Sequence, residues 1–300
     1  MRRAAILSMA VAAIAAAAGA VSCGGGGGVA KRSIRVGSKN FSEQVLLGEI
    51  VAQALEARGA KVDRKLNLGG TFVCHGALIA GELDLYPEYT GTAYTAILRE
   101  KPSSDPALVR RIVAEEYRKR WAAVWAPPLG FENTFALVVR GDDARRLKLA
   151  RISDLKAHPE LKPGFGYEFV EREDGYRGLM RAYGLAFRQR PAEMDLGLLY
   201  PALEAKLVDV VAGNSTDGLI AAIGGVVLED DRRYFPPYEA AFVVRGEIWK
   251  NRPEVREVLE SLAGRLTPAQ MRAWNAKLDK DKKRPEDVAK EVLQAVRGKT

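Results

Sequence analysis

The chain has 300 residues, of which 47% are hydrophobic and 28% charged, and this composition is typical of a globular protein. It excludes a disordered, collagen-like or coiled-coil chain, and the length allows two ordinary domains or one large α/β domain. The formal net charge is +8, but no block of like charges forms a basic tail, so we do not expect nucleic-acid binding. Two cysteines and two histidines are too few for a disulfide framework or the usual structural zinc site, so we expect no metal.

The first 23 residues have the order of an export signal. Arg2 and Arg3 precede an uncharged, alanine-rich stretch that ends in small residues before Cys23. This stretch is short and weakly apolar for a membrane span, which needs roughly 20 strongly apolar residues. Small residues before a cysteine resemble a bacterial lipobox and predict that Cys23 is lipidated. Ordinary signal-peptidase cleavage nearby, which would leave a soluble periplasmic protein, is the alternative.

Five glycines follow, and residues 24–32 are expected to form a flexible tether, because glycine-rich chains behave as random coils. With either cleavage the mature protein is expected in the periplasm or elsewhere outside the cytoplasm, and lipidation of Cys23 would attach it to a membrane. No other segment of the sequence is apolar enough to span a bilayer. Because ATP and NAD are not supplied in that compartment, we expect no cofactor.

From residue 33 the sequence alternates strand-like runs with helical patterns. Residues 42–58 place Leu46, Ile50 and neighbouring apolar side chains on one helical face and end at Gly59, which suits a helix end. Thr267 and Pro268 begin a capping box. The other expected helices are 72–80, 107–121, 176–183, 198–207, 217–223 and one that begins at Pro285, and the expected strands are 34–37, 62–68, 83–86, 135–139, 208–212 and 241–244, with a further apolar run at 165–169. This alternation predicts α/β sheets flanked by helices, in two lobes joined by two crossings of the chain.

Several separated motifs resemble, in order and spacing, the glycine betaine/choline-type (osmoprotectant) substrate-binding proteins of ABC transporters. They are Gly-Ser-Lys-Asn-Phe-Ser-Glu-Gln at 37–44, Leu-Gly-Gly-Thr at 68–71, Leu-Asp-Leu-Tyr-Pro-Glu-Tyr-Thr-Gly-Thr at 83–92, Asn-Thr-Phe-Ala-Leu at 133–137, Arg-Glu-Asp-Gly-Tyr at 172–176, Met-Asp at 194–195, Ser-Thr-Asp-Gly at 215–218 and Phe-Pro-Pro-Tyr at 235–238. The resemblance extends from Ile34 to the C-terminus.

The resemblance implies a type II periplasmic-binding-protein fold, in which two α/β lobes are joined by a two-strand hinge. Residues 33–143 and 234–300 are expected in lobe 1, and residues 144–233 in lobe 2. A protein of this kind closes around a small ligand and delivers it to an ABC permease in the cytoplasmic membrane. We expect a monomer whose partners are this permease and a small quaternary ammonium ligand.

The family resemblance also implies the site residues. A cage for the cationic head of the ligand corresponds to Tyr89, Phe135, Asn214 and Tyr238, and the carboxylate end of a betaine corresponds to Lys39, Thr92 and Arg172. A quaternary ammonium has no N–H to donate, whereas the negative faces of aromatic rings attract it. On the family's topology, Arg172 and Asn214 belong to lobe 2 and the other five residues to lobe 1.

Two positions depart from the expected pattern. Phe135 and Asn214 stand where a tyrosine is expected, and the asparagine removes a ring altogether. Two explanations of the missing ring remain. Either the ligand is bound more loosely, or the ligand has a polar group, such as a hydroxyl, that contacts the amide. The sequence therefore does not decide which solute is bound.

Other interpretations of the sequence stay open beside this one. Gly69, Gly70 and Thr71 before a helix could offer backbone N–H groups to an anion, or form a simple turn with a helix cap. Cys74 and His75 are the pair that could suggest a hydrolase, but adjacent helical residues point about 100° apart, so we expect no enzyme. A binding lipoprotein for another small polar or zwitterionic ligand, or a sensor with the same fold, is the alternative function.

Overall fold

The computed structural model describes residues 32–298. The predicted export signal, the predicted lipidation site at Cys23 and nearly all of the predicted tether lie outside the described residues. Within residues 32–298, none of the helices combines the length and the apolar character that a membrane crossing requires.

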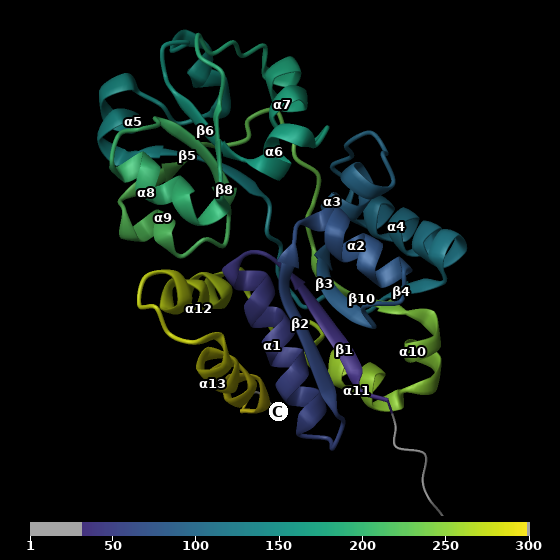
Figure 1. The fold of residues 1–300 in the computed structure, drawn as a ribbon. Coiled ribbons are helices and arrows are strands. Elements are labelled where there is room, and N and C mark those ends of the chain that lie inside the picture. The colour runs from purple at the N-terminus through teal and green to yellow at the C-terminus, as the bar shows by residue number, and fades with distance from the viewer. Residues whose placement is uncertain (1–31, 299–300) are drawn as a thin grey trace, which may run out of the picture. The chain divides into compact units, whose positions relative to one another are not determined.

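One five-stranded sheet, the first sheet, has the strand order β2-β1-β3-β10-β4 (Figure 1). Its strands are β1 (Ile34–Lys39), β2 (Val62–Gly69), β3 (Leu85–Tyr89), β4 (Ala123–Trp125) and β10 (Ala240–Arg245). β1 runs parallel to β2 and β3, whereas β10 runs antiparallel to β3 and β4. All five residues of β3 are buried, because helices cover both faces of the sheet at this strand.

Helices pack on the two faces of the first sheet. Leu85 packs with the residues of α1, whereas the next residue, Tyr86, packs with those of α2 and α4, because successive side chains of a strand point to opposite faces. The helices of this part of the chain are α1 (Ser42–Glu56), α2 (Thr71–Ile79), α3 (Thr90–Thr92), α4 (Pro106–Trp121), α10 (Gly246–Asn251), α11 (Pro253–Leu262), α12 (Pro268–Asp279) and α13 (Pro285–Arg297), with a π-helical turn at Ala93–Ile97. The predicted capping box at Thr267 is present at the start of α12.

A second five-stranded sheet has the strand order β7-β6-β8-β5-β9. Its strands are β5 (Phe135–Arg140), β6 (Pro163–Gly166), β7 (Ala192–Met194), β8 (Val210–Asn214) and β9 (Gly225–Val227). β6 runs parallel to β7 and β8, and β5 runs antiparallel to β8 and β9. Its helices are α5 (Gly141–Leu147), α6 (Tyr167–Glu171), α7 (Tyr176–Tyr183), α8 (Leu199–Glu204) and α9 (Leu219–Ala222), with short 3₁₀ turns at Ile152–Ala157 and Leu196–Leu198.

The chain passes between the two sheets twice, and the two crossing segments run side by side. Glu132 and Glu239 form an antiparallel bridge. Next to this bridge, Asn133 N donates to Tyr238 O over 3.1 Å and Ala240 N donates to Phe131 O over 3.0 Å. In each sheet the one antiparallel strand, β10 or β5, is the strand that enters from the other sheet. The two lobes therefore have the same strand order and are joined by a pair of extended segments, as predicted.

Three expectations differ from the structure. The strand expected at 83–86 lies at Leu85–Tyr89. Phe135 was expected in lobe 1, but it begins β5, which pairs with β8 and β9 of the second sheet. The first crossing therefore lies between Trp125 and Phe135, before the expected boundary after residue 143. The apolar run 165–169 is split, because β6 ends at Gly166 and α6 begins at Tyr167. In the latter two places apolar composition alone does not indicate the sheet or the element to which a segment belongs.

Candidate functional site

A cavity of about 60 Å³ lies between residues of the two sheets. This is several times the roughly 10–15 Å³ that one water requires. All seven residues that the family resemblance indicated line this cavity: Lys39, Tyr89, Thr92, Phe135, Arg172, Asn214 and Tyr238. We call it the first cavity.

The strand ends position these side chains. Lys39 is the last residue of β1 and Tyr89 the last residue of β3, so both lie at the carboxyl ends of neighbouring parallel strands. In the second sheet, Phe135 begins β5 and pairs in register with Asn214 at the end of β8. The crevice beyond such strand ends is the usual ligand site of open α/β sheets.

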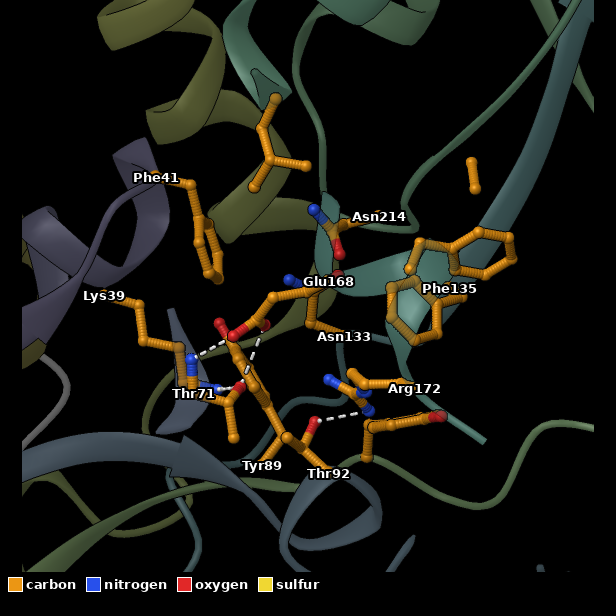
Figure 2. Close-up of a pocket in the computed structure, with 14 residues that line it drawn as sticks. Lys39, Phe41, Thr71, Tyr89, Thr92, Asn133, Phe135, Glu168, Arg172 and Asn214 are labelled. Atoms are coloured by element: carbon orange, nitrogen blue, oxygen red, sulfur yellow. Dashed lines mark hydrogen bonds between the residues drawn. The ribbon is translucent and has the colours of Figure 1, made fainter. Parts of the chain in front are cut away.

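Aromatic rings form much of the wall (Figure 2). The rings of Phe41 and Tyr89 are nearly parallel, with an interplanar angle of 19° and centroids 6.4 Å apart. On the side of the second sheet, the Phe135 ring lies 4.9 Å from that of Phe169 and 5.8 Å from that of Tyr238. Asn214 contributes an amide in place of a ring, so the cavity wall can form hydrogen bonds with a ligand at this position.

Buried carboxylates hold the two tyrosine hydroxyls. Tyr89 donates to Glu43 Oε1 over 2.6 Å, and Tyr238 donates to Asp174 Oδ2 over 2.7 Å. Burial, together with the neighbouring carboxylates, raises the pKa of both tyrosines well above the ordinary value. Both hydroxyls therefore stay protonated, and each hydrogen bond fixes the orientation of its ring.

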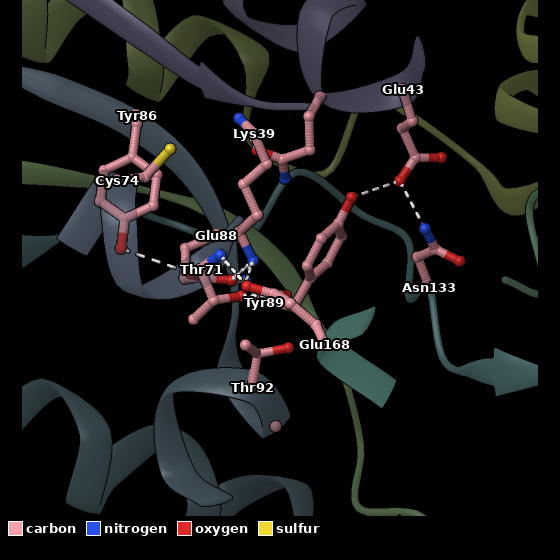
Figure 3. A network of polar contacts seen from close by, with 12 residues as sticks. Lys39, Glu43, Thr71, Cys74, Tyr86, Glu88, Tyr89, Thr92, Asn133 and Glu168 are labelled. Atoms are coloured by element: carbon pink, nitrogen blue, oxygen red, sulfur yellow. Dashed lines mark hydrogen bonds and ion pairs between the residues drawn. The ribbon is translucent and has the colours of Figure 1, made fainter. Parts of the chain in front are cut away.

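The two cations of the cavity are already paired within the protein. Lys39 Nζ forms an ion pair with the fully buried Glu88 and donates to Thr71 Oγ1 over 3.1 Å (Figure 3). Arg172 binds Asp174 through two hydrogen bonds, from Nε over 2.8 Å and from Nη2 over 2.5 Å. Burial alone would raise the pKa of Asp174, but the guanidinium charge brings it below the ordinary value. Each cation therefore already shares its charge with a buried protein carboxylate.

Polar contacts also connect the two lobes across the first cavity. Glu168 of α6 accepts a hydrogen bond from the backbone N–H of Thr71, the first residue of α2, and a second one from Thr71 Oγ1 over 3.1 Å. Arg172 Nη2 donates to Thr92 Oγ1 over 3.3 Å. A Cβ atom at Gly70 would lie only 2.0 Å from Glu168 Oε1, so the glycine is required for this approach. The first backbone N–H of α2 does bind an anionic group, and that group is a carboxylate of the opposite lobe.

Glu43 joins four parts of the chain in one buried network. Its carboxylate accepts hydrogen bonds from Tyr89 OH over 2.6 Å and from Asn133 Nδ2 over 2.8 Å (Figure 3). It also accepts from Thr216 Oγ1 over 2.6 Å and from Asn275 Nδ2 over 2.9 Å. Burial raises the pKa of Glu43, although all four hydrogen bonds oppose that shift. Because the four donors come from β3, the first crossing, the segment after β8 and α12, this carboxylate stabilises the arrangement around the first cavity.

The properties of Cys74 and His75 oppose a nucleophile-and-base pair. Burial raises the pKa of the Cys74 thiol to about 12 and lowers the pKa of His75 to about 4. His75 packs edge-on against Trp121, with ring centroids 4.5 Å apart, and against Tyr117 at 5.4 Å. A thiol that stays protonated is a poor nucleophile, so these residues serve packing.

Seven further residues line the first cavity without having been among the site residues that the resemblance implied: Phe41, Thr71, Asn133, Glu168, Phe169, Leu196 and Ala212. Phe41, Thr71 and Asn133 belong to the motifs that carry the family resemblance, so their place in those motifs could have identified them as site residues. Glu168 stands outside those motifs, and no sequence pattern distinguishes it from the other acidic residues nearby. Only the folded chain brings it to Thr71.

The paired sheets of equal strand order, the double crossing and the cavity between them define the fold of periplasmic binding proteins. Residues 32–295 match the family described as the substrate binding domain of ABC-type glycine betaine transport systems. The chain belongs to this family.

Individual relatives agree with this assignment. The chain is 35% identical over 272 residues to the carnitine transport binding protein OpuCC of Listeria monocytogenes, covering 89% of this chain and 88% of that one. It is 34% identical over 273 residues to a glycine-betaine-binding protein of Pseudomonas aeruginosa, covering 87% of each chain. A crystal structure described as a glycine betaine/carnitine/choline ABC transporter is similar, with a TM-score of 0.71 at 32% identity, over 87% of this chain and 98% of that one.

Proposed function

We propose that this protein is an exported solute-binding protein of an ABC importer and that it binds a quaternary ammonium compatible solute, such as glycine betaine, choline or a relative. The observation that carries the proposal is that aromatic rings from both lobes line the first cavity. The names of the relatives, which specify carnitine and glycine betaine, support the same ligand class.

The physical basis of the proposal is the match between ring faces and a methylated cation. Such a cation cannot donate a hydrogen bond, and each ring face attracts it by roughly 0.5–2 kcal/mol, depending on desolvation. Phe41, Tyr89, Phe135 and Tyr238 supply the rings. Hydroxyl hydrogen bonds already orient two of them, so little conformational freedom is lost on binding.

The carboxylate end of a betaine is assigned to Lys39, Thr92 and Arg172, as the family resemblance implies. The hydrogen bonds of Arg172 within the described residues use Nε and Nη2, which leaves Nη1 for a ligand. Because each cation shares its charge with a protein carboxylate, we propose that this end contributes orientation more than affinity.

Closure of the two lobes around the ligand is the step that connects binding with transport. Glu168 with Thr71, and Arg172 with Thr92, are contacts that form only when the lobes approach each other. A ligand that contacts both lobes favours the closed state by the same logic, and the closed form is the one presented to the permease. The N-terminal sequence supports export, and lipidation of Cys23 would keep the protein at the membrane next to that permease.

Calorimetry on the mature protein tests the ligand class. Glycine betaine, proline betaine, choline and carnitine are titrated, and at least one of them is expected to give saturable heat. Glycine is the matched control, because it keeps the carboxylate of glycine betaine but has an ordinary ammonium group, and no binding is expected. The absence of heat and of a thermal shift with all four solutes would overturn the ligand proposal and leave the fold and the family unaffected.

Replacing Asn214 by tyrosine tests the missing cage wall. The new ring is expected to tighten glycine betaine binding by about two- to thirtyfold, which corresponds to roughly 0.5–2 kcal/mol for one added cation–π contact. Asn214→Leu is the matched control, because leucine adds apolar bulk without a ring face. Equal effects of the two variants would show that burial, not the ring face, strengthens binding, and a loss of affinity in both would mean that the ligand uses the amide.

A further inference from the structure

The segment from Glu168 to Asp174 of lobe 2 contacts lobe 1 at both of its ends. At the first end, Glu168 accepts hydrogen bonds from the backbone N–H and from the hydroxyl of Thr71, the first residue of α2 (Figure 2). At the other end, Asp174 Oδ2 accepts a hydrogen bond over 2.7 Å from Thr95 Oγ1, which belongs to the π-helical turn after α3. Arg172 lies between these two contacts and lines the first cavity. The two contacts therefore fix the position of a site residue relative to lobe 1.

The two contacts differ in how the negative charge is balanced. Asp174 forms a buried ion pair with Arg172, and because both residues belong to lobe 2 this pair does not require lobe 1. Within residues 32–298, both hydrogen bonds that the Glu168 carboxylate accepts come from Thr71 of lobe 1. That partner is the start of a helix, where unpaired backbone N–H groups and the helix dipole favour a negative charge. Glu168 therefore gains its balancing partner only when the lobes close.

Gly70 provides the room that this contact needs. A Cβ atom on Gly70 would lie 2.0 Å from Glu168 Oε1 and 2.5 Å from its Cδ, so a larger residue and the carboxylate exclude each other. The backbone of Gly70 is extended, with φ −79° and ψ −168°, which alanine also adopts. The approach of the opposite lobe, and not the conformation of the turn, therefore requires glycine at this position.

Thr71 connects the same contact to the first cavity. Its hydroxyl donates to Glu168 Oε2 over 3.1 Å and accepts from Lys39 Nζ over 3.1 Å. Lys39 also forms an ion pair with the buried Glu88. A hydroxyl that donates to one partner and accepts from another has a defined orientation. Glu168 therefore orients Thr71, and through it the hydrogen bond of Lys39 beside the ligand site.

We propose that Glu168 is a positioning residue for solute binding, which favours closure of the lobes by capping the start of α2 and acts through Thr71 without a contact to the solute. The inference rests on the proposed function, because it assigns part of the solute affinity to Glu168. A contact that forms only in the closed state raises the equilibrium constant for closure. A solute that binds the closed state gains affinity by the same factor.

A double-mutant cycle, measured by calorimetry with glycine betaine on the mature protein, tests the proposal. Glu168→Ala is expected to weaken binding by about tenfold, because the closed state loses a hydrogen-bonded charge. Gly70→Ala is expected to weaken binding by a similar factor, since it displaces the carboxylate from Thr71 but keeps it in the protein. In the Glu168→Ala background, Gly70→Ala is expected to change the affinity by less than about threefold, because the atoms that its Cβ would meet are then absent. Additive losses would show that the two substitutions act separately and would overturn the inference.

Glu171→Ala is the matched control. Glu171 is the last residue of the same helix, α6, and it is exposed and does not line the first cavity. Its loss removes the same charge without removing the contact to Thr71, so the affinity is expected to equal that of the wild type. Thermal unfolding checks that each variant is folded.

Hydrogen exchange in the ligand-free protein measures the contact without any solute. The Thr71 amide is the donor to Glu168, so it is expected to exchange at least about threefold faster in Glu168→Ala than in the wild type or in Glu171→Ala. A role in the stability of α6 alone would not change the exchange of this amide, because it belongs to the opposite lobe.

The possible outcomes separate this inference from the proposed function. If glycine betaine binds and Glu168→Ala keeps the wild-type affinity, the positioning role is wrong while the proposed function stands. A loss in Glu168→Ala without a loss in Gly70→Ala would show that the carboxylate attracts the solute directly, and this would also overturn the inference. If glycine betaine, proline betaine, choline and carnitine all fail to bind the wild type, the proposed function fails. The exchange of Thr71 then decides the role of Glu168 in closure, and equal rates in the wild type and Glu168→Ala would overturn it.

Discussion

Alanine in place of Tyr238 is expected to weaken the binding of a quaternary ammonium solute by at least about tenfold, which is about 1.4 kcal/mol. The substitution removes one ring face from the first cavity together with its contact to Phe135, whose ring centroid lies 5.8 Å away. It also removes a hydroxyl donor from the buried Asp174. Tyr89→Ala is expected to have an effect of the same size, because its ring faces that of Phe41 across the same cavity.

Tyr238→Phe is the matched control for this prediction. It keeps the ring and loses only the hydrogen bond to Asp174, so the affinity is expected to change by less than about threefold, or about 0.6 kcal/mol. Calorimetry measures the affinities, and thermal unfolding checks that each variant is folded. Unchanged affinity in the two alanine variants would remove both tyrosines from the binding site. Equal losses in Tyr238→Phe and Tyr238→Ala would assign the effect to the hydroxyl.

Glu43→Ala is expected to lower the free energy of unfolding by about 3 kcal/mol or more, because four buried donors lose their acceptor and each such loss costs roughly 1–3 kcal/mol. The donors belong to Tyr89, Asn133, Thr216 and Asn275. Part of the loss is offset, since burying the carboxylate is itself unfavourable, as its raised pKa indicates. Urea unfolding followed by circular dichroism measures the change.

Glu56→Ala provides the comparison on the same helix, α1. Glu56 is an exposed residue that forms an ion pair with Arg64, and surface pairs of this kind contribute about 0–1 kcal/mol. We therefore expect a loss below about 1 kcal/mol in this variant. A Glu43→Ala loss as small as that of Glu56→Ala would mean that water replaces the carboxylate without cost and that the network does not hold the site together.

Much of the fold could be predicted from local patterns in the sequence. Helix α7 spans Tyr176–Tyr183 as expected, and the alternation of strands and helices predicted the layered α/β architecture. The failures have a common cause. Phe135–Arg140 forms an apolar strand that would fit either sheet, and only its pairing with β8 and β9 assigns it to the second one. Hydrophobic pattern specifies that a strand is buried, but it does not specify its neighbours.

The candidate site, like the fold, was only partly predictable from the sequence. Seven positions taken from the motifs meet around one cavity, although their part in binding stays a prediction. The sequence did not predict that both cations of that cavity are neutralised by protein carboxylates, because the ion-pair partners of Arg172 and Lys39 depend on which side chains are buried beside them. Asp174 is two residues from Arg172 and could have been taken for a surface partner, yet both are buried. Glu168 reaches Thr71 across 97 positions of the chain.

By itself, the sequence determined the succession of strands and helices, the family motifs and the kinds of side chain available to a ligand, because these depend on short-range periodicity and on residue identity. Only the tertiary structure decided which carboxylates neutralise Lys39 and Arg172, and which sheet carries Phe135. Those properties depend on contacts between segments distant in the chain. Such long-range contacts decide both which groups are buried and which groups pair, and a local sequence pattern does not predict either.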